Sequence, residues 1–388
     1  MEACIVGNST SLIWSLPFLL SRSGFSVDVI TTSHLLSASL FVRNVYQTET
    51  VDETLRTAYE LICSRATPYD WVIAGDDEIL WKLSRCPWPD SSQPKYLPLT
   101  RSGCISHIYS KIGLSRVLSS AGLKTPAFLV ASTCEDAVSA ARQLGYPVLI
   151  KTDSASGGTG IYTCKGDQDI WKLRPLFTGQ PLLIQQRIEG RELDLSAIYF
   201  DRKLVHFTYS LIERTTPKTT ALSAIRTYHP LAIIPEDVFE ELAALGRALD
   251  ASGFASISCI DAADGSGRYY FEADMRPNVW VDVSRFYGED AALRIRDWFV
   301  SGKTLSRPAI EPDTNLAAIT IPHFMRIARW ELITNRHNVW RFIPWSDTSV
   351  VLRQLCSRTF MPVARSVVPQ KLRQVVKRGM IGAGIAFP

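Results

Sequence analysis

The first hundred residues alternate between short apolar runs and longer amphipathic repeats, which is the pattern of strands separated by helices. The runs predict strands at Ala3–Gly7, Phe25–Ile30 and 70–77, and the repeats predict helices at Leu12–Ser23 and Val51–Ala66. Because strand, helix and strand follow one another, we expect parallel pairing in an open sheet. The pattern therefore predicts a small parallel α/β domain over residues 1–97, with the proline-rich segment Pro87–Pro98 as a linker or loop.

The next two hundred residues mix helices with strands that lie close enough in sequence to form hairpins. Helices are predicted at Ser106–Ala121, Cys134–Leu144 and Asp237–Ser252, and strands at Thr125–Val130, Val148–Lys151, Leu182–Gln186, Glu192–Tyr199, Lys203–Tyr209, Ala255–Asp261 and Tyr269–Ala273. Hairpin turns are expected at Asp201-Arg202 and around Asp264–Gly267. This pattern predicts an α+β arrangement in the part of the chain that follows residue 97.

Composition narrows the class of protein. The chain has 388 residues, of which 46% are hydrophobic and 21% charged, as is usual for a globular protein of two or three domains. No apolar stretch reaches the length of a membrane span, and the N-terminus lacks the basic region of a secretory signal. The eight cysteines show no C-x-x-C or zinc spacing, so we expect free thiols and a cytoplasmic location. The net charge of +4 is too small to indicate nucleic-acid binding.

The last forty residues carry an uneven charge. From residue 348 to residue 388 the chain has seven basic residues and no acidic residue. One interpretation is a solvated tail or a helix lying on the body of the protein, and another is a contact with an acidic partner, an anionic lipid or a carrier protein. The sequence does not separate these interpretations.

The first candidate for a functional residue is Lys151, which ends an apolar strand and precedes a loop of small residues containing Gly157, Gly158 and Gly160. A lysine is a point charge for phosphate, and a glycine-rich loop can turn backbone N–H groups towards phosphate oxygens. The order of residues differs from a Walker loop and from a dinucleotide-binding fingerprint. The segment therefore indicates phosphate binding of another kind.

Four separated motifs together resemble those of ATP-grasp enzymes, over roughly residues 1–300. They are Lys111 on a helix, Lys151 with its glycine loop, the segment Ile184–Glu192, and Asp261 followed by Tyr270–Asn278. The resemblance implies a parallel α/β pre-ATP-grasp domain over residues 1–97 and an ATP-grasp domain over residues 98–302. The second domain is expected to have a lid subdomain at about 107–184 and a metal-binding subdomain at about 185–302, and residues 303–388 are expected to form a C-terminal accessory extension.

The resemblance also implies an ATP site. Its expected members are Lys111 and Lys151 at the phosphates; Ser156, Gly157, Gly158 and Gly160 in the phosphate lid; Gln185, Gln186, Arg187 and Ile188 at the adenine; and Glu192 at the ribose hydroxyls. Thr152 and Ala155 depart from the usual lid sequence, and Gln185 stands where the family often has glutamate. From the residues alone, an exposed helix lysine at Lys111 and a solvent-facing glutamate at Glu192 are the alternatives.

Three acidic residues are expected to hold Mg²⁺, with Mn²⁺ as an alternative ion. Glu272 and Asp274 are two apart on a strand, so their side chains share a face, and Asp261 on the preceding strand is expected beside them. The family usually has asparagine at the position of Asp274. Three surface acids near a turn are the alternative interpretation.

Arg276 matches the arginine that often follows the metal motif, and we expect it, with Lys151, to act in catalysis on the transferred phosphoryl group. Lys218 and Arg226, which lie in a polar stretch expected to connect the hairpin to the helix at Asp237–Ser252, and Asn278 are weaker candidates for substrate or phosphate contacts.

The implied activity is that of an ATP-dependent carboxylate–amine ligase, which forms an amide-type bond through an acyl phosphate and releases ADP and phosphate. The alternatives are a non-catalytic ATP-binding regulatory module and an ATP-grasp enzyme that uses a thiol or another nucleophile. The expected partners are a small carboxylate and an amine, with a homodimer as the default assembly. The aromatic and basic segment 319–345 is either a cap on the substrate cleft or an accessory subdomain with its own core.

Overall fold

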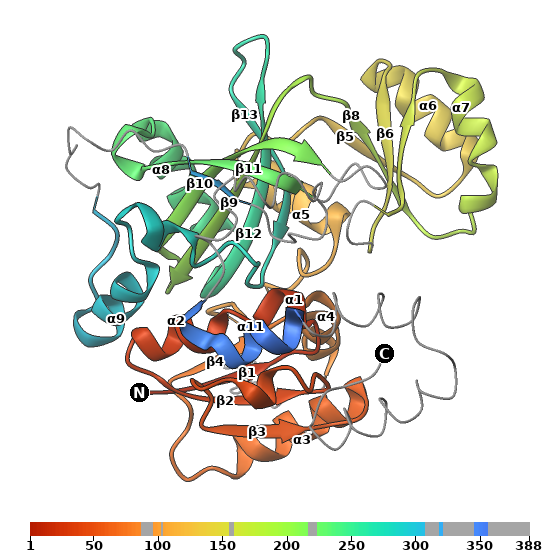
Figure 1. Ribbon diagram of the computed structural model, residues 1–388. Helices are drawn as coiled ribbons and strands as arrows, with labels where there is room; N and C mark the ends of the chain where they lie inside the picture. The colour runs from red at the N-terminus through yellow and green to blue at the C-terminus, as the bar shows by residue number, and fades with distance from the viewer. Residues whose placement is uncertain are drawn as a thin grey trace, which may run out of the picture.

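The computed structural model describes residues 1–86, 96–101, 104–154, 159–215, 223–306, 318–320 and 345–355. Within these residues the main strands form three sheets, which Figure 1 shows. A parallel sheet from the N-terminal part lies below, a large antiparallel sheet lies above it, and a small antiparallel sheet projects to one side. This arrangement confirms the predicted fold class, a parallel α/β part followed by an α+β part.

The N-terminal sheet has the strand order β3-β2-β1-β4, and its neighbouring strands are parallel. Its elements in chain order are β1 (Glu2–Val6), α1 (Thr10–Ile13), α2 (Leu16–Arg22), β2 (Ser26–Thr31), η1 (Leu36–Ala38), β3 (Asn44–Gln47), α3 (Val51–Ser64), β4 (Trp71–Ala74) and α4 (Asp77–Arg85). The central strands are buried on both faces, because α2 packs on one face and α3 with α4 packs on the other. The helix expected at Leu12–Ser23 is divided in two, since Pro17 lies in the first turn of a new helix.

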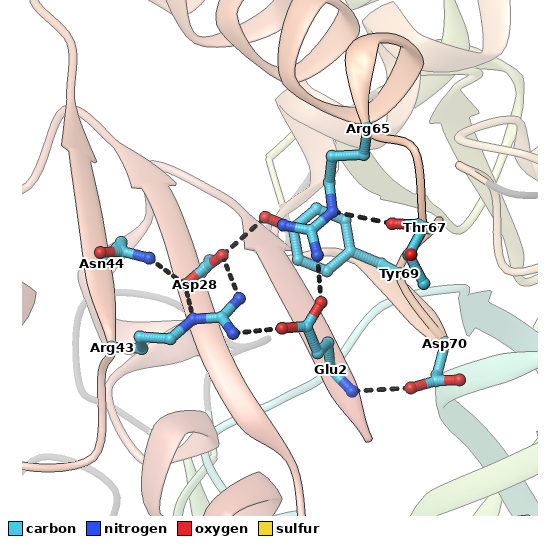
Figure 2. A network of polar contacts seen from close by, with 8 residues as sticks. All are labelled: Glu2, Asp28, Arg43, Asn44, Arg65, Thr67, Tyr69 and Asp70. Carbon is cyan, nitrogen blue, oxygen red and sulfur yellow. Dashed lines mark hydrogen bonds and ion pairs between the residues drawn. The ribbon is translucent and has the colours of Figure 1, made fainter.

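A polar network lies at the end of this sheet where its strands begin (Figure 2). The carboxylate of Asp28 on β2 is fully buried, and it accepts hydrogen bonds from Arg43, Asn44 and Tyr69. Glu2 on β1 pairs with Arg43 and with Arg65. The network lies at the amino ends of the strands, so it leaves the loops at their carboxyl ends available for a ligand.

The small sheet has the order β5-β8-β6-β7, and its strands are antiparallel. Its elements are β5 (Phe128–Ala131), α6 (Cys134–Leu144), β6 (Val148–Thr152), β7 (Ile161–Cys164), α7 (Asp167–Lys172), η3 (Arg174–Leu176) and β8 (Leu182–Gln186). Its buried side chains come from these elements alone and form a core of their own. The small sheet is therefore a separate packing unit, as a lid requires.

The large sheet has the order β13-β12-β9-β10-β11-β14, and its strands are antiparallel. Its strands and neighbouring helices are α5 (Lys111–Ser120), β9 (Gly190–Phe200), β10 (Lys203–Thr215), β11 (Ser223–His229), η4 (Leu231–Ile233), α8 (Glu236–Ala248), β12 (Gly253–Ala262), β13 (Arg268–Asp274), η5 (Val283–Tyr287), α9 (Ala291–Ser301) and β14 (Ala318–Thr320). The turn between β9 and β10 is the predicted one, with positive φ at both Asp201 and Arg202. One face of the sheet packs on α8 and α5. On the opposite face of β9, Asp194 and Ser196 are polar, whereas Ile198 and Phe200 pack on the N-terminal part.

The large sheet and the N-terminal sheet share hydrophobic cores. Trp71 of β4 stacks on Phe254 of β12, with ring centroids 4.9 Å apart, and also contacts Phe200 of β9 edge to face. A second cluster joins α3 and α4 to β9 and α8. These two parts of the chain therefore form one packed body, whereas the small sheet has a separate core.

The beginning of the basic C-terminal stretch lies against the N-terminal part. Helix α11 (Thr348–Leu355) follows η8 (Trp345–Asp347), and Figure 1 shows it beside α1 and α2. Asp347 is buried and accepts hydrogen bonds from Ser39 and from the backbone N–H of Leu40. Arg353 donates to the carbonyl oxygen of His34. For residues 348–355 the interpretation as a helix on the body of the protein is confirmed.

Several predictions lie outside the described residues: most of the segment Pro87–Pro98, nearly all of the aromatic segment 319–345, and the tail beyond residue 355. The seven cysteines in the described ranges are free thiols, as expected. Among the described helices, none combines the length and the apolar character that crossing a membrane demands.

Candidate active site

Two lysines meet at the junction of the small sheet with α5. Lys151 lies in β6 with 4% of its surface exposed, and its ammonium group is 5.0 Å from the centre of the Phe271 ring on β13. Burial lowers the pKa of Lys151 to about 8, although the nearby Glu272 and Glu192 act in the opposite direction. Lys111 is the first residue of α5, and its Nζ lies 3.5 Å from the carbonyl oxygen of Asp153.

Asp153, which the sequence analysis did not select, brings the two lysines together. One oxygen of its carboxylate accepts from the backbone N–H of Ile112 at 2.8 Å, and both oxygens accept from Ser110 Oγ. Since Ser110 is the N-cap of α5, these bonds tie the end of β6 to the start of the helix that carries Lys111. The position of Asp153, two residues after a strand lysine, is the signal that points to this role.

The glycine loop connects β6 to β7 as a hairpin. Ser156, Gly157 and Gly158 lie outside the described residues, so their predicted phosphate contacts remain predictions. Gly160 closes the loop with a φ of +69°, and a Cβ at this position would lie 2.1 Å from Thr152 Oγ1. Glycine is therefore required here for both conformation and space.

The segment expected at the adenine leaves β8 and turns into β9. Gln185 is 1% exposed, and within the described residues its Nε2 has no hydrogen-bond partner. Gln186 N–H donates to the carbonyl of Ala127, and Arg187 N–H donates to that of Pro147. These two N–H groups are thus engaged by protein carbonyls, and the expected adenine contacts of this segment remain predictions.

Glu192 lies on β9 and faces the same side of the large sheet as Asp194 and Glu272. Burial raises the pKa of Glu192 to about 7, and the charges of Asp194 and Glu272 raise it further, while Arg226 and Lys151 lower it. A glutamate in this environment is half-buried rather than solvent-facing, so the alternative of an ordinary surface residue does not hold.

Two of the three expected metal ligands come together and the third does not. Glu272 pairs with Ser258 across the ladder, and Asp274 pairs with Ser256, both on the polar face. Asp261 pairs with Arg268, whose side chain contacts Glu241 of α8. Asp261 therefore belongs to the opposite face, and its assignment to the metal site is corrected.

The physical reason is a β-bulge in β13 at Phe271. Between Tyr270 and Glu272 the register shifts by one residue, because Tyr270 pairs with Cys259 and Glu272 pairs with Ser258. An extra residue on one strand moves the following side chains to the other face. Without this bulge Glu272 would lie on the face of Asp261, as the simple alternation of the sequence predicted.

Asp194 is an acidic residue of the polar face that the sequence analysis missed. It lies two residues after Glu192 on β9, so the alternation of the strand would have placed it on the same face. Asp194 is buried and pairs at 2.7 Å with Arg226, whose guanidinium also lies 4.4 Å from the centre of the Trp280 ring. Arg226 is thus held on β11, inside the sheet, rather than in the polar connection that the sequence suggested.

The remaining candidates have different surroundings. Asn278 is buried and already bonded to Ser196, Ser256 and the backbone N–H of Trp280, so it supports the site rather than presenting free groups to a phosphate. Lys218 lies outside the described residues.

Arg276 lies between two carboxylates. Its Nε donates to Asp77 of α4 at 2.6 Å, and its Nη2 donates to Asp274 at 2.7 Å. Burial raises the pKa of Asp274 to about 8, the charge of Arg276 lowers it, and Glu272 raises it. Burial also raises the pKa of Glu272, while Lys111, Lys151 and Arg276 oppose this effect.

The donor set fits a phosphate-bound divalent cation. Within the described residues no group of three histidine, cysteine or acidic side chains is placed to hold a metal by itself. Mg²⁺ in nucleotide sites is held by one or two carboxylates together with phosphate oxygens, and Glu272 and Asp274 supply two carboxylates whose burial disfavours their charge. With Lys111, Lys151 and Arg276 beside them, the site is suited to a polyphosphate that brings its own cation.

This fold and site define a class of nucleotide-binding protein, and comparisons with known proteins agree. Residues 111–176 match the family model described as the carbamoyl-phosphate synthase L chain ATP-binding domain. The chain is 26% identical over 222 residues to the carbamoyl phosphate synthase large chain of Agathobacter rectalis, a match that covers 54% of this chain and 20% of that protein. The chain thus spans about a fifth of the length of this relative.

Solved structures show the same fold. N5-carboxyaminoimidazole synthetase from Staphylococcus aureus, complexed with ADP, superimposes with a TM-score of 0.62 and 15% identity, over 82% of this chain and 80% of that chain. The biotin carboxylase domain dimer of Hydrogenobacter thermophilus 2-oxoglutarate carboxylase, in complex with MgADP, gives a TM-score of 0.58 and 13% identity, over 79% and 71%. These comparisons support the ATP-grasp fold that the sequence motifs resemble.

Proposed function

We propose that the protein is an ATP-dependent ligase that joins a small carboxylate to an amine through an acyl phosphate and releases ADP and phosphate. The observation that carries this proposal is the convergence of Lys111, Lys151, Glu272, Asp274 and Arg276 at the junction of the small and large sheets. These residues combine cationic phosphate contacts with hard carboxylate ligands, which are the groups that phosphoryl transfer requires.

Each residue has a distinct task in this proposal. Lys111 and Lys151 bind and partly neutralise the phosphates of ATP, and Glu192 accepts hydrogen bonds from the ribose hydroxyls. Glu272 and Asp274 hold Mg²⁺, which supplies positive charge on the phosphate oxygens when it is bound. Arg276 stabilises the negative charge of the phosphoryl group while it is transferred.

The proposed chemistry needs no covalent enzyme nucleophile. The substrate carboxylate attacks the γ-phosphorus, and the bond from that phosphorus to the bridging oxygen of ADP breaks. The amine then attacks the acyl carbon, loses a proton, and displaces inorganic phosphate. The protein contributes orientation, charge stabilisation and exclusion of water.

The experiment that tests the proposal is release of ADP and phosphate in the presence of Mg²⁺ and a panel of carboxylic acids, each with and without amines or thiols. ADP release that depends on both an acid and an amine supports the ligase. Release that depends on a thiol supports the other acceptor class. ATP binding without turnover on the whole panel would support a regulatory module, and AMP as the product would exclude the acyl phosphate. The cytoplasmic location and the homodimer remain predictions.

A further inference from the structure

Arg276 is held by two acidic residues that come from different parts of the chain. Asp274 precedes it by two residues on β13, whereas Asp77 belongs to α4 of the N-terminal part, 199 positions earlier. The side chain of Arg276 is only 11% exposed, and its Nη1 also donates to the carbonyl of Pro277. A guanidinium has more N–H donors than these contacts use, so it can bind a further anion while it is held.

Asp77 is itself firmly placed. It is the first residue of α4, and the N-cap Asp76 accepts hydrogen bonds from the backbone N–H groups of Ile79, Asn8 and Ser9. The turn before it passes so close to α1 that a Cβ on Gly75 would lie 2.4 Å from Ile13 Cγ2. These contacts lock the carboxyl ends of β1 and β4 together, and they fix the backbone from which Asp77 reaches Arg276.

The two partners of Arg276 differ in what else they must do. Asp274 faces Glu272 and the phosphate site, so in the proposed function its charge is shared with a metal ion. The side chain of Asp77 is 18% exposed and forms its ion pair with Arg276, at 2.6 Å. Asp77 is therefore the partner that keeps Arg276 in place when Asp274 is engaged elsewhere.

We propose that Asp77 is a positioning residue for the transferred group: it orients Arg276, so that the N-terminal part of the chain completes the catalytic centre. The kinetic consequence of this inference rests on the proposed function. Its structural consequence rests only on the ion pair between Asp77 and Arg276. Sequence distance hides this relation, because the acidic turn at 75–78 resembles any turn that follows a parallel strand.

The kinetic test uses two substitutions of Asp77 and one matched control. Asp77→Ala removes the acceptor, while Asp77→Asn keeps an acceptor oxygen and removes the charge. The control is Asp282→Asn, because Asp282 also pairs with an arginine across the same two parts of the chain, Arg22 at 2.6 Å. Urea unfolding of each variant identifies any that fail to fold.

For Asp77→Ala we expect kcat to fall on the order of 10- to 100-fold, as for supporting partners of a reactive group. The KM for MgATP is expected to change by less than about threefold, since in this proposal Asp77 acts through Arg276. Asp77→Asn is expected to lie between wild type and Asp77→Ala, and Asp282→Asn to retain the wild-type kcat. An unchanged kcat in folded Asp77→Ala, or an equal loss in the control, would overturn the inference.

A second measurement does not depend on turnover. In ¹⁵N-arginine-labelled protein, the Nε–H resonance of Arg276, assigned by its loss in Arg276→Lys, reports the bond to Asp77. We expect this resonance to be protected from exchange in wild type and in Asp282→Asn, and to be lost or shifted in Asp77→Ala. If wild type turns over no substrate, the proposed function fails, and the resonance still decides whether Asp77 holds Arg276. A resonance unaltered in Asp77→Ala contradicts the inference whatever the activity.

Discussion

Two clusters of acidic side chains in this molecule, one fully buried and one half-buried, have opposite electrostatic character. Burial raises the pKa of Asp28, but hydrogen bonds from Arg43, Tyr69 and Asn44 outweigh burial and hold that pKa below its ordinary range (Figure 2). At Glu272 and Asp274 burial prevails, and both pKa values are raised. Donors of the protein thus compensate the first cluster, whereas burial dominates in the second.

This difference helps to distinguish a carboxylate that stabilises the fold from one that belongs to a functional site. Both clusters contain arginines at short distances, so the presence of an ion pair is not informative. What differs is whether hydrogen-bond donors compensate for desolvation, as they do around Asp28, which accepts from three side chains at 2.7–3.0 Å. The uncompensated carboxylates of Glu272 and Asp274 also lie beside Lys111 and Lys151, and this combination makes them candidates for a cation site.

The largest effect should come from the uncompensated cluster. In Glu272→Gln we expect ATP turnover to fall on the order of 10²- to 10³-fold, because a ligand for the phosphate-bound cation is removed. Asp261→Asn is the matched control, since the bulge at Phe271 places Asp261 on the opposite face of the sheet. Steady-state assay of ADP release measures both, and a comparable loss in Asp261→Asn would restore Asp261 to the site.

The converse experiment removes the charge of Asp28, the carboxylate whose burial is compensated by hydrogen bonds. Asp28→Asn should lower the free energy of unfolding by about 2–3 kcal/mol, because Arg43 and Tyr69 lose their charged partner and Arg43 can only partly reach solvent. The KM for MgATP should stay at the wild-type value, since the network lies at the edge of the sheet away from the site. Urea unfolding provides the comparison with Asp274→Asn, for which a similar loss of stability would remove the distinction between the two clusters.

The two kinds of carboxylate also predict opposite dependence on pH. Since the folded pKa of Asp28 lies below the ordinary value of 3.8, its contribution to stability is present above that value and is lost as the pH falls through the folded pKa. Each unit of lowering is worth about 1.4 kcal/mol. Burial raises the pKa of Asp282 to about 6 despite Arg22 and Arg285, so its contribution is present below 3.8 and is lost as the pH rises through 6.

Unfolding measured between pH 3 and pH 7 checks these signs. Asp28→Asn should flatten the loss of stability at the acid end, and Asp282→Asn should flatten the loss between pH 4 and pH 6. Equal pH profiles for wild type and Asp28→Asn would contradict the compensated state of Asp28.

The smallest effect concerns a single donor in the compensated cluster. Tyr69→Phe removes the hydroxyl that donates to Asp28 at 2.7 Å, and the cost should be about 1 kcal/mol, as for one buried hydrogen bond. The stacking of Arg65 over the ring, 4.1 Å from its centre, is retained in phenylalanine. Urea unfolding that shows no change would indicate that the other donors alone compensate Asp28.

The bounds of individual helices and strands could be predicted from the sequence. The strand at Leu182–Gln186 and the helix at Cys134–Leu144 have the predicted bounds, because apolar periodicity and the flanking Thr133 and Gly145 mark them. Lys111 and Lys151 could be chosen because they match the motifs of a known family, and Lys151 also ends a predicted strand. The helix expected from Ser106 begins instead at Lys111, after a turn in which Tyr109 has a φ of +54°.

Features that depend on pairing between distant segments could not be predicted from the sequence. The face of Asp261 depends on a bulge whose position no single strand reveals, and the contact of Arg276 with Asp77 joins residues far apart in the chain. Arg226 was placed in a connection because the strand that contains it, β11, has little apolar alternation. In each case tertiary packing, rather than local preference, decides where the side chain lies.

The extra residue at Phe271 has a consequence for how this protein is compared with its relatives and how it varies. A one-residue deletion there would leave every acidic residue in place and yet turn Glu272 and Asp274 towards α8, which would abolish the site without any substitution. A sequence alignment that is judged only by the presence of the acidic residues would still assign a complete site to such a chain. The length of β13 is thus as informative about activity as the identity of its acids.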